Sequence, residues 1–235
     1  GVCSSLFFGA AYRSAAGWTA AAYALAALLT LFLTDPPGTP PPAEERLPLR
    51  SAVRWSLAHA PLLAGAALFA ETVQFVAVFL SQLQYRRAGI PLRWFGLLYV
   101  LTALAALAGA RSHRLTSWLG DRRSAGVLLG GGAALCLLLA LLPLPLPSVL
   151  GIMGLRAALA LFEPVSLDLQ SRAAPPGGAA AQLSCNAMVM ELTAAVLDPA
   201  LGAAADWGAG WALLAGAAAC GGGLFLFLYG LRRLA

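Results

Sequence analysis

Arg156 and Glu163 are the residues best placed to do chemistry, because both lie within the apolar stretch 148–170, which is long enough to cross a bilayer as a helix. A charge at membrane depth costs at least ~2.5–3.5 kcal/mol, so it persists where it is paired or faces a water-filled cavity. Seven positions separate the two residues, which places them on one helix face about two turns apart. This separation is too large for a direct ion pair, so we expect a neighbouring helix to line that face with polar groups.

Carboxylates outnumber cations at the expected membrane depth. The charged residues within the apolar stretches are Glu71, Arg156, Glu163, Asp168, Glu191 and Asp198. Five carboxylates cannot all stay ionised around one guanidinium, because desolvation and like charge both favour the protonated acid. We therefore expect some of them to bind protons at neutral pH, or a cationic substrate to neutralise the excess. The alternatives are that Arg156 only clamps two helices together, and that Asp168 and Asp198 reach the interface from the ends of their stretches.

The spacing of polar residues predicts directed helix faces. The stripe expected on the first helix after the linker consists of residues three or four apart: Glu71, Gln74, Val78, Gln82 and Tyr85. Asp198 precedes Pro199, and this pair predicts a helix break that frees a backbone carbonyl beside a cavity. The stretches 124–142 and 209–231 carry no acidic residue and no arginine at depth, as expected for the lipid-facing third helix of each of two helix triplets.

The composition is typical of a membrane protein. Of the 235 residues, 60% are hydrophobic and 11% are charged, whereas soluble domains carry about 25% charged residues. After a partial helix at residues 1–12 and a turn at residues 13–17, we expect spans at 18–34, 57–83, 93–113, 124–142, 148–170, 180–201 and 209–231. The glycine triplets at 130–132 and 221–223 are expected to mark close helix contacts.

Residues 35–56 are the one expected linker, because their prolines forbid a regular helix and their mixed charges favour water. Orientation follows from arginine asymmetry, since cytoplasmic loops carry the excess of positive charge. Ten arginines fall on the side of this linker and four on the other side. The linker and the C-terminus are therefore predicted to be cytoplasmic.

The sequence offers little for enzymatic or metal chemistry. The four cysteines are scattered singly, and the only histidines, His59 and His113, lack a metal-binding spacing. No nucleophile–base pair is apparent. We expect no enzyme activity, no cofactor and no metal. Because the arginines sit where loops are expected, we also expect no nucleic-acid partner.

Three stretches resemble the major facilitator superfamily (MFS) of secondary transporters. Residues 9–33 are similar to the family's passage from helix five to helix six, residues 109–123 to its loop between helices eight and nine, and residues 172–213 to its helix eleven and flanks. The family uses that loop as a cytoplasmic latch, and its motif corresponds here to Gly109, His113, Arg114, Gly120, Asp121, Arg122 and Arg123, with His113 at the acidic position.

The resemblance implies an all-α, polytopic membrane helical bundle in a bacterial-type inner (plasma) membrane. Residues 1–34 would be the end of the N-terminal half (partial helix five and helix six), 35–56 the central cytoplasmic linker, and 57–235 the C-terminal six-helix domain (helices seven to twelve). A chain that starts at Gly1 inside an apolar run fits a fragment whose N-terminal half is missing.

The resemblance also implies proton-coupled alternating access by rocking of two six-helix halves, with efflux of amphipathic, cationic small molecules favoured. On this view the cavity is lined by Glu71, Gln74, Arg156, Glu163 and Glu191, and Glu71 and Glu163 bind protons or cations. The implied partners are the lipid bilayer, protons, a small-molecule substrate and the missing half. Alternatives are proton-coupled uptake of a sugar, nucleoside or other metabolite, a membrane enzyme, and a non-transporting membrane scaffold.

Overall fold

Helices form almost all of the part of the chain that the computed structural model describes, namely residues 11–30, 49–174 and 179–234. Within these ranges there is no β-strand. Six helical segments there are long and apolar enough to cross a membrane: Ala60–Arg87, Leu92–Leu119, Asp121–Leu141, Pro145–Arg172, Ala179–Asp206 and Ala209–Arg233. The predicted all-α polytopic membrane bundle is confirmed at this level, and every predicted span after the linker coincides with one of these segments.

The first two spans are assembled from several helical pieces. The first consists of α4 (Ala60–Phe75), the π-helical turn η2 (Val76–Leu80) and α5 (Ser81–Arg87). The second consists of η3 (Leu92–Trp94), α6 (Phe95–Ala105), η4 (Ala106–Arg111) and α7 (Ser112–Leu119). The remaining spans are the single helices α8 (Asp121–Leu141), α9 (Pro145–Arg172), α10 (Ala179–Asp206) and α11 (Ala209–Leu234).

Two expectations about the N-terminal part are wrong. The turn predicted at residues 13–17 belongs to helix α2 (Ala11–Thr30), because its alanines favour a helix and a single glycine does not end one. The predicted linker also ends early, since α3 (Leu49–Ala58) begins directly after the last proline of that segment. Residues 1–10 and 31–48, which hold the rest of these predictions, lie outside the described residues.

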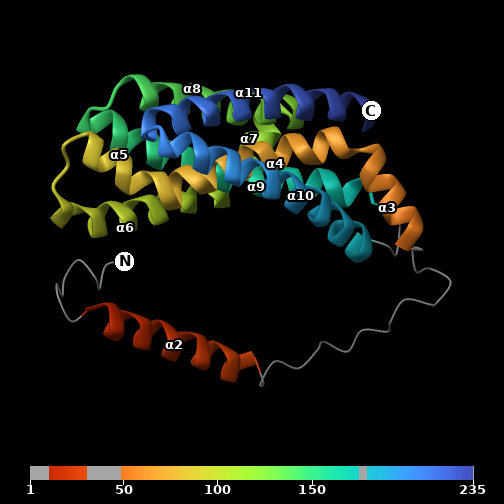
Figure 1. The fold of residues 1–235 in the computed structure, drawn as a ribbon. Coiled ribbons are helices and arrows are strands. Elements are labelled where there is room, and N and C mark those ends of the chain that lie inside the picture. Colours follow the sequence, from red (N-terminus) through yellow and green to blue (C-terminus); the bar gives the residue numbers. More distant parts are fainter. Residues whose placement is uncertain (1–10, 31–48, 175–178, 235) are drawn as a thin grey trace.

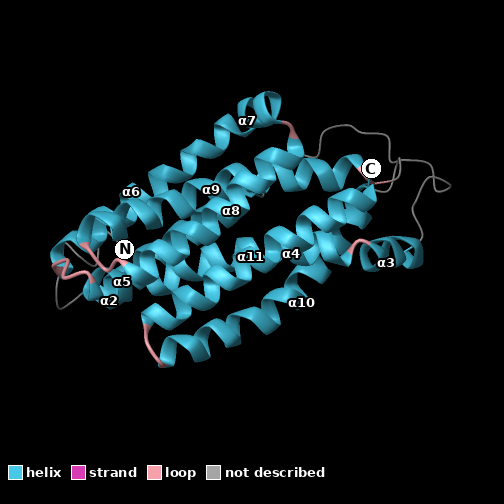
Figure 2. Ribbon diagram, turned by 90° about the horizontal axis from the view of Figure 1, so that it is seen from above, coloured by secondary structure: helices cyan, strands magenta, loops and turns pink. Residues whose placement is uncertain are grey.

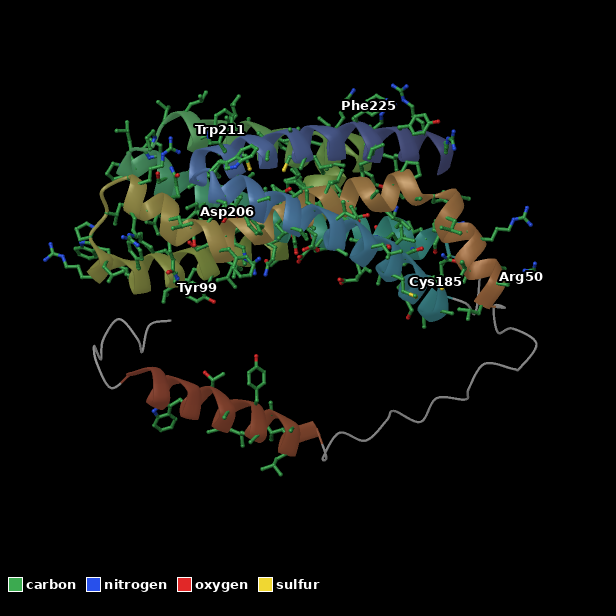
Figure 3. All side chains as sticks on the ribbon, viewed as in Figure 1. Arg50, Tyr99, Cys185, Asp206, Trp211 and Phe225 are labelled. Carbon is green, nitrogen blue, oxygen red and sulfur yellow. The ribbon has the colours of Figure 1, made fainter. Side chains whose placement is uncertain are left out.

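Helix α4 lies at the centre of the bundle and contacts α11, α10 and α9, while α11 also packs on α8, and α6 with η4 packs on α9. Figure 1 shows α8 and α11 along one side of the bundle, and Figure 2 shows α6 and α7 at one edge and α10 at the opposite edge. Helix α3 and the C-terminus lie at the same end (Figure 1), as an even number of spans requires. Asp206 and Trp211 lie at the other end (Figure 3).

An aromatic cluster joins the central helices. Phe162 of α9 stands edge-on to Phe69 of α4 and to Phe227 of α11, with ring centroids 5.1 Å and 5.3 Å apart. All three rings are buried. Edge-to-face pairs of this kind add about 0.5–1.5 kcal/mol each beyond the area that they bury.

Glycines set the distance between α4 and α11. A Cβ atom on Gly65 would lie 2.5 Å from the backbone nitrogen of Phe227, and one on Gly230 would lie 2.6 Å from that of Leu62. Of the two glycine triplets, Gly132 and Gly223 make the predicted close contacts, with the Phe69 ring and the Gly65 carbonyl. The prediction is wrong for the other triplet members, which face open space or, at position 130, only an ordinary contact.

We expect Gly65→Ala to destabilise the bundle by about 1–3 kcal/mol, because the new methyl group overlaps the backbone of α11. Chemical unfolding in detergent micelles, followed by circular dichroism, measures the change. The matched control is Gly222→Ala, whose Cβ would meet nothing within 4 Å; it should be neutral or stabilise by ~0.5–1 kcal/mol. Equal stability of the two variants would contradict the close α4–α11 contact.

Candidate functional site

Six polar residues from α4, α9 and α10 lie far from the ends of their spans. They are Glu71, Gln74, Arg156, Glu163, Glu191 and Asp198. Each of the three spans has 28 residues, and a helix of that length is ~42 Å long, against ~30 Å of hydrocarbon in a bilayer. Asp198, which is nearest to a span end, precedes Asp206 by eight residues, or ~12 Å. All six residues therefore lie at the depth of the hydrocarbon, and we call them the polar face.

Arg156 of α9 is joined to α4 by a hydrogen bond in which its Nη1 donates to Oε1 of Gln74 at 2.7 Å. The expectation that a neighbouring helix supplies the polar partner, and not Glu163, is confirmed. The partner is an amide and not a carboxylate. Gln74 is uncharged, and the described residues offer Arg156 no ion pair, so no carboxylate neutralises the guanidinium on this face.

Glu71 of α4 is half-buried, and the negative charges of Asp198 and Glu191 on α10 act on it. The interpretation of Asp198 as an interfacial residue is wrong, because α10 continues to Asp206. The predicted helix break at Pro199 is also wrong, since α10 runs through it. Pro199 still lacks an N–H, so it donates no helical bond to the preceding turn. Glu71 thus lies within electrostatic range of two carboxyl groups of α10, the helix that packs on α4.

Glu163 lies apart from that acidic cluster. It is exposed on α9, and it has no hydrogen bond or ion pair with the residues that the structure describes. Helix α9 continues through the following Pro164. The structure therefore places Glu163 on a helix of the polar face without joining it to Glu71.

The stripe predicted along the first span is only partly correct. Gln74, Val78 and Gln82 are exposed, but Tyr85 is buried, with its ring 5.6 Å from that of Phe95. The cause is the π-helical turn at Val76–Leu80, which widens one turn of the helix and shifts the register of everything after it. Turns of this kind often occur at functional sites, and this one begins two residues after Gln74.

The loop motif lies mostly in helices, so its placement in a loop is wrong. Gly109 belongs to η4, His113 and Arg114 belong to α7, and only Gly120, with a φ of 75°, is outside a helix. A Cβ atom on Gly109 would lie 2.7 Å from the carbonyl oxygen of Ala160. That oxygen has no helical donor because the residue four positions later is Pro164. Gly109 thus allows η4 to approach α9 closely.

An ion-pair network occupies the end of the bundle where α8 begins. Arg172 at the end of α9 lies 3.6 Å from Asp121 of α8, and it also pairs with Asp168 one turn earlier. Asp168 therefore lies at a span end, as the interfacial alternative for it proposed. Arg122 and Arg123 follow Asp121 as exposed residues in the first turn of α8.

A buried network of uncharged polar side chains joins α3, α9 and α10, and the sequence reasoning did not find it. Ser56 of α3 donates to Oδ1 of Asn186 at 2.7 Å, and Nε2 of Gln182 donates to the same oxygen at 2.9 Å. Nδ2 of Asn186 donates to Oε1 of Gln170 at 3.1 Å, and Nε2 of Gln170 donates to Ser166 at 3.2 Å. The only available signal was the presence of amides within the apolar stretches 148–170 and 180–201, and amides carry no charge.

A second missed pair of residues, Gln84 and Arg87, completes the C-terminus of α8. Nε2 of Gln84 donates to the Leu139 carbonyl at 3.0 Å, and Nη2 of Arg87 donates to the Ala140 carbonyl at 3.0 Å. The Leu139 carbonyl is available because Pro143 cannot donate the helical bond. This contact gives a structural role to Arg87, the last residue of the first span.

In comparisons with protein families, curated proteins and solved structures, nothing matches this chain. The site must therefore be judged from its own chemistry. No group of metal-ligating side chains occurs among the described residues. The polar face combines carboxyl groups that can bind protons or cations with one arginine and one amide.

We expect the polar face to be in contact with water. In Gln74→Cys the new thiol should react roughly tenfold faster with a membrane-impermeant maleimide than in Ala134→Cys, because the reactive thiolate forms in water. Ala134 is an exposed mid-span residue of α8, outside the polar face. Labelling of intact vesicles is compared with that of the unsubstituted chain, whose Cys136, Cys185 and Cys220 are buried. Equal rates at the two positions would place the polar face in lipid.

We expect Asn186→Leu to destabilise the fold by about 1–3 kcal/mol, because it removes three buried hydrogen bonds and leaves Oε1 of Gln170 without its donor. Unfolding in micelles measures the effect. Ser184→Ala, on an exposed position of the same helix, is the control and should have little effect. A neutral Asn186→Leu would show that the network adds nothing to stability.

Proposed function

We propose that the chain is part of a secondary transporter that moves a small molecule across a membrane by proton-coupled alternating access. The observation that carries the proposal is the polar face: Glu71 of α4 lies within electrostatic range of Glu191 and Asp198 on the adjacent α10, and the Arg156–Gln74 bond lies one turn further along α4. Six apolar helices of spanning length provide the membrane setting. The resemblance of the sequence to the major facilitator superfamily agrees with this function.

The energetics of charge favour a wet cavity over lipid beside this face. Four carboxyl groups and one guanidinium lie at hydrocarbon depth, and Gln74, Glu163 and Glu191 are exposed on the surface of the bundle. Exposure of even one such charge to hydrocarbon costs at least ~2.5–3.5 kcal/mol. A second helical unit that encloses water against α4, α9 and α10 would remove this cost. We propose that this unit is the N-terminal half of the same transporter.

The acidic cluster supports proton coupling. Nearby carboxyl groups repel one another when all of them are ionised, and a bound proton or cation relieves that repulsion. A cationic substrate would relieve the same repulsion, which allows proton and substrate to compete for one site. Exchange of an amphipathic cation against protons requires that the two compete for one site. We therefore favour efflux of such a cation, driven by protons that move inward.

Two alternatives remain as outcomes of experiment. Proton-coupled uptake of a sugar, nucleoside or other metabolite would use the same carboxyl groups with the opposite direction of cargo movement. A non-transporting scaffold requires buried charges that are fully paired. The lack of any ion pair for Glu163 and Arg156 within the described ranges speaks against the scaffold.

We expect Glu71→Gln to reduce proton-driven transport by about 10²-fold, the scale of losing a positioned proton-transfer group. Everted vesicles carrying the complete gene product are acidified by ATP hydrolysis, and a pH-sensitive dye reports proton release when ethidium is added as cationic cargo. Asp206→Asn, an exposed acid at the end of α10, is the matched control and should transport normally. The same assay with Glu163→Gln determines whether that isolated carboxyl group contributes. Unchanged, pH-driven transport in both glutamine variants would remove Glu71 and Glu163 from the coupling mechanism.

A further inference from the structure

An open pocket of about 530 Å³ lies at the end of the bundle that holds α3 and the C-terminus. Its charged lining consists of Asp121, Arg122, Arg172 and Arg232, contributed by the start of α8 and the ends of α9 and α11. We call it the arginine pocket. It lies away from the polar face, whose residues are near the middle of their spans.

The lining of the arginine pocket carries more positive than negative charge. Asp121 and Asp168 both pair with Arg172. Arg122 and Arg232 are exposed and have no carboxylate partner in the described part of the chain. Three guanidinium groups therefore surround one lining carboxylate, which favours an anion that can accept several N–H donors. Phosphate has this character, and arginine matches its geometry with paired donors.

The position and lining of the arginine pocket favour an amphipathic anion. Asp121 is the first residue of its span, Arg172 is the last of its own, and Arg232 is next to the last, so the guanidinium groups lie at the level of lipid headgroups. Leu169 and Leu231 line the pocket within one turn of these arginines, on the side of the hydrocarbon. A soluble phosphate would make no use of these leucines, whereas a phospholipid places its acyl chains there.

We propose that the arginine pocket binds the headgroup phosphate of an anionic phospholipid, with its acyl chains over Leu169 and Leu231. Basic pockets between spanning helices bind such headgroups in membrane proteins. A lipid with an added cationic choline is disfavoured, because that cation meets the unpaired Arg122 and Arg232. The proposal does not depend on the transport function, since the arginine pocket lies at one end of the bundle and the polar face lies near the middle of the spans.

Native mass spectrometry of the purified full chain in dodecylmaltoside tests the proposal with equimolar phosphatidylglycerol and phosphatidylcholine. We expect a preferred adduct of one phosphatidylglycerol, and a preference about tenfold lower in Arg122→Gln/Arg232→Gln, because each arginine near the membrane surface adds to the attraction. Arg122→Lys/Arg232→Lys should retain most of the preference. The matched control, Arg86→Gln/Arg93→Gln, removes the same charge at the opposite end and should bind as the unsubstituted chain does.

Three results would overturn the proposal: an unchanged preference in Arg122→Gln/Arg232→Gln, equal binding of the two lipids by the unsubstituted chain, or displacement of the lipid by inorganic phosphate or glycerol 3-phosphate. The last result would assign the pocket to a soluble phosphate. Circular dichroism confirms that each variant is folded. If the double variant does not fold, Arg232→Gln alone decides the question, and an undiminished preference in it counts against the proposal.

Discussion

The structure depends on one constraint: a polar group held at hydrocarbon depth must find a partner or water. Most of the uncharged groups find partners, although the buried Thr72 hydroxyl of α4 has none among the described residues. Amides and hydroxyls bond across α3, α9 and α10, and the Leu139 carbonyl released by Pro143 is taken up by Gln84. The acidic residues of α4 and α10 do not, and the single arginine among them is bonded to an amide. The amides and hydroxyls that stabilise the fold are therefore different groups from the acidic residues that are available to bind protons or cations.

The apolar contacts explain why the polar face stays at the surface. Phe69, Phe162 and Phe227 fill the interior between α4, α9 and α11, and Gly65 with Gly230 lets α4 and α11 approach at backbone distance. This packing occupies one side of α4 completely. The other side, which carries Glu71 and Gln74, is left between α9 and α10. The charges are therefore presented outward by the same packing that stabilises the core.

The sequence predicted the spans well because continuous hydrophobicity is a strong signal, and it predicted which helices carry charge at depth. Prediction from the sequence was less accurate where a local feature determines the end of a helix or the burial of a side chain. The end of α10 extends past Asp198, and proline does not interrupt that helix, because neighbouring helices support it. The π-helical turn after Phe75 has no recognised sequence signal, so the burial of Tyr85 could not be anticipated. Buried amides such as Asn186 are uncharged, and hydrophobicity alone does not reveal their partners.

The hydrogen bonds at the two ends of the bundle also limit how it can move. Gln84 and Arg87 tie the first span to α8 at one end, and the amides around Asn186 tie α3, α9 and α10 at the other. Sliding of these helices along one another would break the bonds. The helices that these bonds join are therefore resistant to shear, and a displacement that keeps the bonds intact must carry the first span together with α8, and α9 together with α10.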